Sequence, residues 1–275
     1  MKETIWEHLF AGNGEIWDMM TIREYKRAES LEEAWQLNQK KSNRVLGGML
    51  WLKMENINVG TAIDLSALGL DTIEETPEEF SIGAMVSLRQ LEQHAGLNAY
   101  THGAAREAVR HIVGVQFRNL ATVGGSVYGR FGFSDVLTLL LAMDCEVELY
   151  KAGRVPLKDF AASGYDRDIL VRVIIKKEPA EFYYQSVRSS QTDFPVLACA
   201  AARTADGQYR FAVGARPGKA VLVQPQGVAL QELPAWVRAQ IPVDSNLRGS
   251  AEYRSHLVGV LAKRAVKELE QRAGA

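Results

Sequence analysis

Two pairs of adjacent glycines constrain this chain more than any other feature. Gly47-Gly48 stands in NRVLGGMLWLKM, and Gly124-Gly125 stands in FRNLATVGGSVYGRFGFSD, which has four glycines. Glycine has no Cβ, so its backbone can approach a ligand where any other residue would collide. Each pair adjoins strand-like residues, and two facing main-chain loops could surround a diphosphate with N–H donors. Glycine counting alone leaves open two unrelated tight turns.

Charge and apolar runs exclude two classes of partner. Lys plus Arg (32) nearly balance Asp plus Glu (33) among the 275 residues, so no broad field favours nucleic acid or an anionic membrane. The longest apolar run, VLTLLLAM at 136–143, is far shorter than the roughly 20 residues of a membrane-spanning helix. We expect no nucleic-acid partner and no membrane span. The length favours two or three modules.

The cysteines and histidines predict no metal site. Cys145 and Cys199 lie far apart without Cys-x-x-Cys spacing, so this chain encodes no iron–sulfur or Cys-rich zinc site. We expect both to be buried, reduced thiols. His94, His102 and His111 form no His-x-x-x-His pair with an acidic companion. The first residues lack the pattern of a signal peptide, and we expect a cytoplasmic protein.

The first half of the chain has a mixed pattern of helices and strands. Ser30-Leu-Glu-Glu33 is a capping box that predicts a helix ending before residue 40, and Ser87-Leu-Arg-Gln90 opens another. Strand composition marks 59–66, 79–85 and 145–151. Helical spacing marks 103–113 and the apolar run 136–143. Residues 117–135 are expected to form a glycine-rich loop.

The second half begins after a seam at Lys176-Lys-Glu-Pro179. YYQSVRSS, PVLACAAAR, QYRFAV and AVLVQ predict a meander of strands. The last element, 250–272, has the pattern of a helix whose buried stripe is Leu257, Leu261, Ala265 and Leu269.

Three familiar site motifs are absent. No glycine cluster has the G-x-G-x-x-G spacing of a Rossmann site. GARPGKA at 214–220 lacks the length and the final Ser or Thr of a phosphate loop, and we expect a hairpin turn there. GGSVYG at 124–129 is one residue too long for a nucleophile elbow. No residue is a convincing general acid or base.

The order of segments resembles a known family over nearly the whole chain. TIREYKRAESLEEAWQL, NRVLGG, TAIDLSALGL, FSIGAMVSLRQLE and IVGVQFRNLATVGGSVYGRFGFSDVLTLLLAMDCEVEL follow one another as in the FAD-binding medium subunit of molybdenum hydroxylases, the xanthine dehydrogenase FAD-subunit family. The ending SNLRGSAEYRSHLVGVLAKRAV looks like the C-terminal domain of carbon monoxide dehydrogenase flavoproteins.

The resemblance implies an α+β fold with a defined domain order. It implies a two-subdomain FAD-binding domain of the vanillyl-alcohol-oxidase (PCMH) type at 20–177, divided at about 75/76, and a C-terminal flavoprotein domain of sheet and helix at 178–275. Residues 1–19 would be an N-terminal extension. The apolar residues of this extension, Trp6, Leu9, Phe10 and Trp17, favour packing on this chain or on a partner. The alternative is that the extension is an unrecognised leader.

The resemblance also implies a cofactor site. In the family, an A-G-G-T-x-L loop and a T-x-G-G-N loop enclose the FAD diphosphate. Here Met49 replaces the Thr and Ser126 replaces the Asn, so main-chain N–H groups would hold more of the phosphate charge. The implied cofactor-binding residues are Val45, Leu46, Gly47, Gly48, Met49, Leu50, Trp51, Ile112, Ala121, Thr122, Gly124, Gly125, Ser126, Tyr128, Asp135, Asp168, Ile169, Leu170 and Gln185.

Several of these residues have separate implied roles. Asp135 would accept hydrogen bonds from FAD hydroxyls, or would instead be the N-cap of the following helix. Ile112 and Tyr128 would lie near the ring systems, and Ile169-Leu170, after Asp168, would add apolar contact or simply pack in the core. Gln185 stands where many relatives carry Lys.

The function implied by the resemblance is electron transfer. FAD on this chain would pass electrons from [2Fe-2S] clusters on a small partner subunit to NAD⁺ or another acceptor. A large partner subunit would carry the molybdenum cofactor and oxidise the substrate, with xanthine or another purine preferred. Two alternatives stay open: a non-redox scaffold with a degenerate FAD fold, and a free-standing flavin oxidase.

Overall fold

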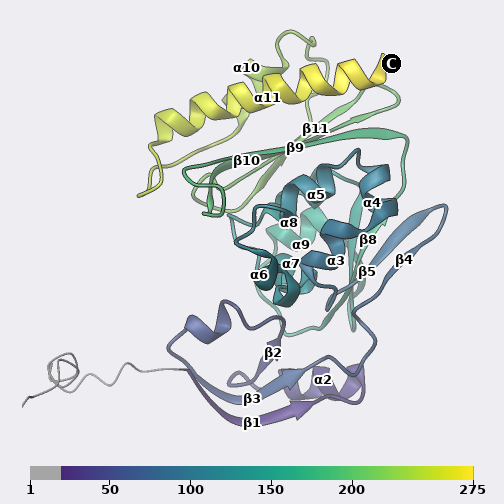
Figure 1. The fold of residues 1–275 in the computed structure, drawn as a ribbon, viewed down its shortest axis with the longest axis vertical. Helices are drawn as coiled ribbons and strands as arrows, with labels where there is room; N and C mark the ends of the chain where they lie inside the picture. The colour runs from purple at the N-terminus through teal and green to yellow at the C-terminus, as the bar shows by residue number, and fades with distance from the viewer. Residues whose placement is uncertain (1–19, 275) are drawn as a thin grey trace, which may run out of the picture.

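The computed structural model describes residues 20–274 and contains three β-sheets (Figure 1). The expectations about residues 1–19 lie outside this range. Within 20–274, no helix has both the length and the apolar character needed to cross a bilayer.

The first sheet contains the strand that leads into the first glycine pair. Its order is β1 (Thr21–Arg27), β3 (Asn58–Asp64), β2 (Arg44–Leu46), with both outer strands parallel to β3. Helix α2 (Leu31–Asn38) begins at the predicted capping residue, because the Ser30 hydroxyl accepts a hydrogen bond from the Glu33 amide. Strand β2 stops directly before Gly47, and the chain then turns into the short 3₁₀ helix η1 (Leu52–Met54).

The second sheet and its helices form the middle of the molecule. The antiparallel order is β4 (Ile73–Glu75), β5 (Glu79–Gly83), β8 (Leu170–Lys176), β6 (Cys145–Leu149), β7 (Gly153–Pro156). The helices are α3 (Leu88–Gln93), α4 (Ala95–Tyr100), α5 (Ala104–Val109), α6 (Val115–Leu120), α7 (Val123–Tyr128), α8 (Asp135–Leu141) and α9 (Leu157–Ala162). The capping box predicted at Ser87 is present at α3.

The expectation of a loop over 117–135 is wrong in part, because α6 and α7 occupy much of it. Thr122 caps α7 by accepting a hydrogen bond from the Gly125 amide at 3.1 Å, so both glycines lie in the first helical turn. A Cβ on Gly124 would lie 2.6 Å from the Ala84 carbonyl oxygen, so close packing on Ala84 explains this glycine. The N-cap of α8 is Ser134, which excludes that role for Asp135.

The third sheet is the predicted meander. Its antiparallel order is β12 (Val221–Val223), β11 (Tyr209–Gly214), β10 (Pro195–Thr204), β9 (Ala180–Arg188). The hairpin predicted at 214–220 joins β11 to β12. Helices α10 (Leu233–Gln240) and α11 (Ala251–Ala273) cover one face of this sheet, and α5 and α8 lie against the other (Figure 1). The predicted stripe of α11 is buried.

Strand β10 is buried on both faces. Ala198, Ala200 and Ala202 belong to the core shared with the middle helices, whereas Cys199 and Ala201 belong to the core under α10 and α11. Successive strand residues point to opposite faces. This placement explains why PVLACAA is apolar throughout instead of alternating.

Candidate functional site

One cavity of about 680 Å³ lies where the first sheet, helices α6 to α8 and the start of β8 meet. Its volume falls within the ~300–1,000 Å³ of small-molecule and cofactor sites. The predicted residues that line it are Val45, Leu46, Gly47, Gly48, Met49, Leu50, Trp51, Ile112, Ala121, Thr122, Gly124, Gly125, Ser126, Tyr128, Asp135, Asp168, Ile169 and Leu170. Of the residues predicted to bind the cofactor, only Gln185 is absent from this lining.

The two glycine pairs pack against one another at this cavity. A Cβ built on Gly47 would lie 2.9 Å from the Thr122 hydroxyl oxygen, and one on Gly48 would lie 2.0 Å from the Leu120 carbonyl oxygen. The second contact is with backbone, so no rotamer change could relieve it. The pairs are therefore neighbouring parts of one site and not unrelated turns.

The two loops differ in the hydrogen-bonding state of their amides. Within residues 20–274, the amides of Gly48, Met49, Leu50 and Trp51 donate no hydrogen bond. In the second loop, by contrast, every amide from 123 to 126 is used: the acceptors are Val86 O, Ala84 O, Thr122 Oγ1 and Thr122 O. Free donors therefore come from the first loop, and the second loop presents a wall with little side chain.

Three non-glycine residues with positive φ lie at or near the cavity. Met49 has φ of 58°, Val113 has 50° and Arg130 has 46°, all in the left-handed region that L-residues seldom adopt. Met49 and Val113 line the cavity, and Arg130 follows the cavity helix α7 by two residues. Such conformations persist only where the surroundings hold them, and they concentrate at ligand sites.

Aromatic side chains form one wall. The Trp51 ring centroid lies 5.4 Å from that of Phe194, 5.7 Å from Phe133, and 6.4 Å from both Phe117 and Phe131. All five residues line the cavity. The aromatic run around residues 117–133 was visible in the sequence, whereas Phe194 comes from a distant loop that no local pattern connects to it.

A buried ion pair closes another part of the wall. Asp135 Oδ1 lies 2.7 Å from Nη2 of Arg188 and also accepts a hydrogen bond from the Tyr184 hydroxyl. Burial raises the pKa of Asp135, and the Arg188 guanidinium opposes this shift. Asp135 Oδ2 makes no hydrogen bond to any other residue of the 20–274 range. Arg188 lines the cavity and was missed from the sequence, because a lone arginine at a strand end carries no site signal.

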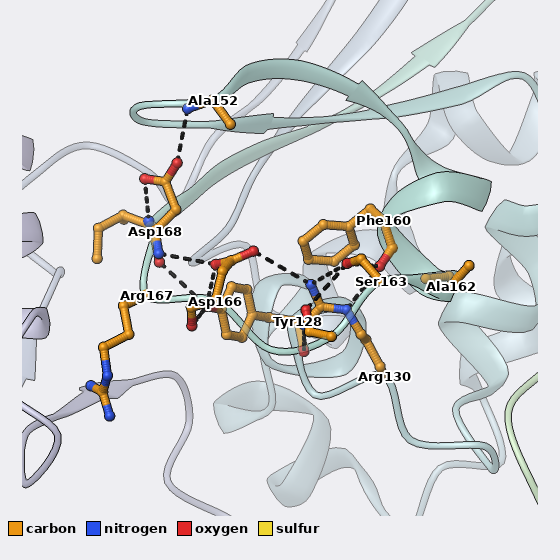
Figure 2. Close-up of polar contacts among 12 residues, drawn as sticks. Tyr128, Arg130, Ala152, Phe160, Ala162, Ser163, Asp166, Arg167 and Asp168 are labelled. Carbon is orange, nitrogen blue, oxygen red and sulfur yellow. Dashed lines mark hydrogen bonds and ion pairs between the residues drawn. The ribbon is translucent and has the colours of Figure 1, made fainter.

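Tyr128 is held by the segment that follows α9 (Figure 2). Its hydroxyl donates to the backbone oxygen of Asp166 at 2.8 Å and to Oδ1 of the same residue at 2.9 Å. Burial, with the Asp166 carboxylate as the next cause, raises the pKa of Tyr128. Asp166 also lines the cavity and was not predicted.

Asp168 lies at the cavity with its carboxylate turned to the β6–β7 hairpin. That carboxylate accepts a hydrogen bond from the amide of Ala152 at 2.9 Å (Figure 2). It also accepts one from the amide of Lys151 at 3.0 Å. Ile169 and Leu170, which follow it, are both buried.

Gln185 lies away from the cavity because of strand alternation. Tyr184, its neighbour on β9, packs in the middle core, whereas Tyr183 packs in the core under α11. Gln185 shares the face of Tyr183 and accepts a hydrogen bond from its hydroxyl at 2.7 Å. Arg188 is the residue of this strand that reaches the cavity.

Comparison with known proteins identifies the class. Residues 19–177 match the family described as the FAD binding domain in molybdopterin dehydrogenase. The chain belongs to this family, and its cofactor is FAD. It is an oxidoreductase subunit of the molybdenum hydroxylase type.

Individual relatives are similar in sequence to this chain over nearly its whole length. The chain is 27% identical to the uncharacterized protein YgfM of Escherichia coli K12, over 91% of this chain and 97% of that protein. It is 24% identical to the glyceraldehyde dehydrogenase medium chain of Sulfolobus acidocaldarius, over 89% of this chain and 97% of the other.

Solved structures share the fold. A chain of carbon monoxide dehydrogenase from Hydrogenophaga pseudoflava matches with a TM-score of 0.80 at 22% identity, over 90% of this chain and 97% of that chain. A chain of quinoline 2-oxidoreductase from Pseudomonas putida 86 matches with 0.78 at 18% identity, over 91% and 97%. The predicted α+β fold of FAD subunits is confirmed.

Proposed function

We propose that this chain is the FAD-carrying electron-transfer subunit of a molybdenum hydroxylase complex. The observation that carries the proposal is that both glycine loops line the same cavity, in a chain of this family. Bound FAD supplies redox chemistry that no side chain offers, because a flavin exchanges electrons singly or in pairs. The protein binds, orients and insulates it.

The residues present fit FAD. Four consecutive amides, from Gly48 to Trp51, donate no hydrogen bond within the described part of the chain and suit the diphosphate, since such runs of N–H groups bind anions without lysines. Arg44 and Arg167 also line the cavity and add positive charge. Oδ2 of Asp135, which accepts no hydrogen bond from residues 20–274, suits a hydroxyl group of the cofactor.

The apolar and aromatic walls suit the ring systems. We assign ring contact to Tyr128, Ile112 and the aromatic cluster around Trp51, with Ile169 and Leu170 as further apolar contacts. Flat apolar walls exclude water from a cofactor and fix its orientation through a few polar groups. Gln185 has no place in this assignment.

Partner subunits complete the proposal. We propose a large subunit with the molybdenum cofactor and a small subunit with [2Fe-2S] clusters, with NAD⁺ or another acceptor receiving the electrons. The relative named as a medium chain supports such a multi-subunit assembly. We propose xanthine or another purine as the substrate of the complex, on the resemblance to xanthine dehydrogenase medium subunits. The domain boundaries at 20–177 and 178–275 remain part of the proposal, as does a cytoplasmic location.

The test is purification of the chain with its natural partners. We expect a yellow complex that releases FAD on denaturation and reduces NAD⁺ or a dye with a purine substrate. FAD titration of the chain alone should give micromolar or tighter binding. Absence of binding after reconstitution would favour the scaffold, and oxygen-dependent turnover by the lone chain would favour a free-standing oxidase.

A further inference from the structure

Arg130 carries a buried charge beside the cavity without lining it. Its side chain is 1% exposed, although its backbone has the strained φ of 46°. An unpaired cation at such a site would be strongly destabilising. The local structure must therefore satisfy the guanidinium closely.

The guanidinium binds α9 and the start of the segment after it, residues 163–168, which we call the strap (Figure 2). Nε donates to the Phe160 carbonyl at 2.9 Å, and Nη2 donates to the Ser163 hydroxyl at 3.3 Å. The guanidinium carbon lies 3.8 Å from the centre of the Phe160 ring, a cation–π contact. Nη1 donates to the Tyr128 carbonyl at 3.2 Å, which joins the strap to the cavity helix.

The same guanidinium faces the carboxylate that holds Tyr128. Arg130 Nη2 lies 3.8 Å from Asp166 Oδ2. Asp166 Oδ1 accepts hydrogen bonds from the Tyr128 hydroxyl at 2.9 Å and from the Asp168 amide at 3.0 Å. One side of the carboxylate thus meets Arg130, and the other meets Tyr128.

We infer that Arg130 is a positioning residue for FAD. Its guanidinium fixes the strap and, through the Asp166 carboxylate, holds the Tyr128 ring at the cavity wall. A wall already ordered before binding loses less side-chain entropy when the ligand arrives, and affinity rises accordingly. This inference rests on the proposed function, since it takes FAD as the ligand.

The first test is FAD titration with Arg130→Gly and Arg130→Met. Glycine adopts a φ of 46° without strain, so Arg130→Gly keeps the backbone path while it removes the whole side chain, whereas Arg130→Met keeps an apolar stem and removes the guanidinium. We expect both variants to raise the FAD Kd about tenfold, or about 1.4 kcal/mol. The matched control is Arg272→Met. Arg272 lies on α11 and donates to the Phe182 carbonyl at 2.7 Å. The Kd of this control variant should equal that of the wild type.

The second test is a double-mutant cycle with Tyr128→Phe. If Arg130 acts through Tyr128, Arg130→Met in the Tyr128→Phe background should change the Kd far less than tenfold. A general loss of structure would instead give the same fold-change in both backgrounds. Equal fold-changes would overturn the inference.

The third test needs no FAD. Hydrogen exchange of the strap, including the Asp168 amide, should be faster in Arg130→Gly than in the wild type and unchanged in Arg272→Met. Unchanged exchange in Arg130→Gly would overturn the inference. A wild-type chain that binds no FAD would overturn the proposed function as well, whereas a chain whose affinity survives Arg130→Gly would overturn this inference alone.

Discussion

Gly48 has no room for a side chain. A Cβ there would lie 2.0 Å from the backbone oxygen of Leu120, so Gly48→Ala must separate the two loops. We expect the FAD Kd to rise tenfold or more, equivalent to about 1.4 kcal/mol, together with a lower urea midpoint. Fluorescence titration and urea denaturation measure the two effects.

The control for this substitution is Gly259→Ala in α11. A Cβ there would meet nothing closer than 3.5 Å, the Cδ of Arg238. Alanine is favoured over glycine within a helix by about 1 kcal/mol. The urea midpoint should therefore rise and the FAD affinity should not change. Equal FAD affinity in Gly48→Ala and the wild type would contradict the loop packing.

At the scale of elements, Glu32 fastens helix α2 to the β6–β7 hairpin. Its carboxylate accepts hydrogen bonds from Lys151 at 2.7 Å, Tyr150 at 2.8 Å and Gln36 at 2.8 Å, which lower the pKa of Glu32 from 4.5 to about 2. A lowered folded-state pKa stabilises the fold above the unfolded value, and the stabilisation disappears as pH falls through the folded value.

The prediction concerns Glu32→Gln. The difference in unfolding midpoint between the wild type and this variant should be largest above pH 4.5 and should vanish as pH approaches 2. Urea denaturation at a series of pH values measures it. A difference independent of pH would show that the contacts of Glu32 do not depend on its charge.

Helix α11 depends on its buried stripe. Leu261 is fully buried under the third sheet, so Leu261→Ala should lower the free energy of unfolding by about 2–5 kcal/mol. Leu247→Ala, at a fully exposed position, is the control and should leave the urea midpoint unchanged. A small loss in Leu261→Ala would mean that α11 adds little to the core.

Sequence patterns predicted most elements because local rules dominate them. The N-caps at Ser30 and Ser87 and the stripe of α11 depend on neighbours three or four residues away. Helix α7 was missed because its glycine pair weighs against helix, and the packing of Gly124 on Ala84 that explains this glycine is long-range. The same limit hid Arg188 and Phe194, which reach the cavity only through the register of β9 and the turn after it.

At the scale of the whole molecule, one hydrophobic core joins the second and third sheets. It includes Val173 of β8 and Ala200 of β10, so the two sheets should unfold together. FAD at one hundred times its Kd should raise the free energy of unfolding by about 2.7 kcal/mol. Thermal denaturation followed by circular dichroism and by tryptophan fluorescence should give one midpoint that rises with FAD; two midpoints would contradict a shared core.

Because β10 is buried on both faces, the order of synthesis limits the order in which the parts of this protein can fold. During synthesis, α5 and α8 leave the ribosome long before the strand that covers them. Arg188, which neutralises Asp135 at the cavity, emerges late as well. The lining of the cavity ends at Pro195, so the nascent chain cannot complete its cofactor pocket until the segment through this residue has left the ribosome.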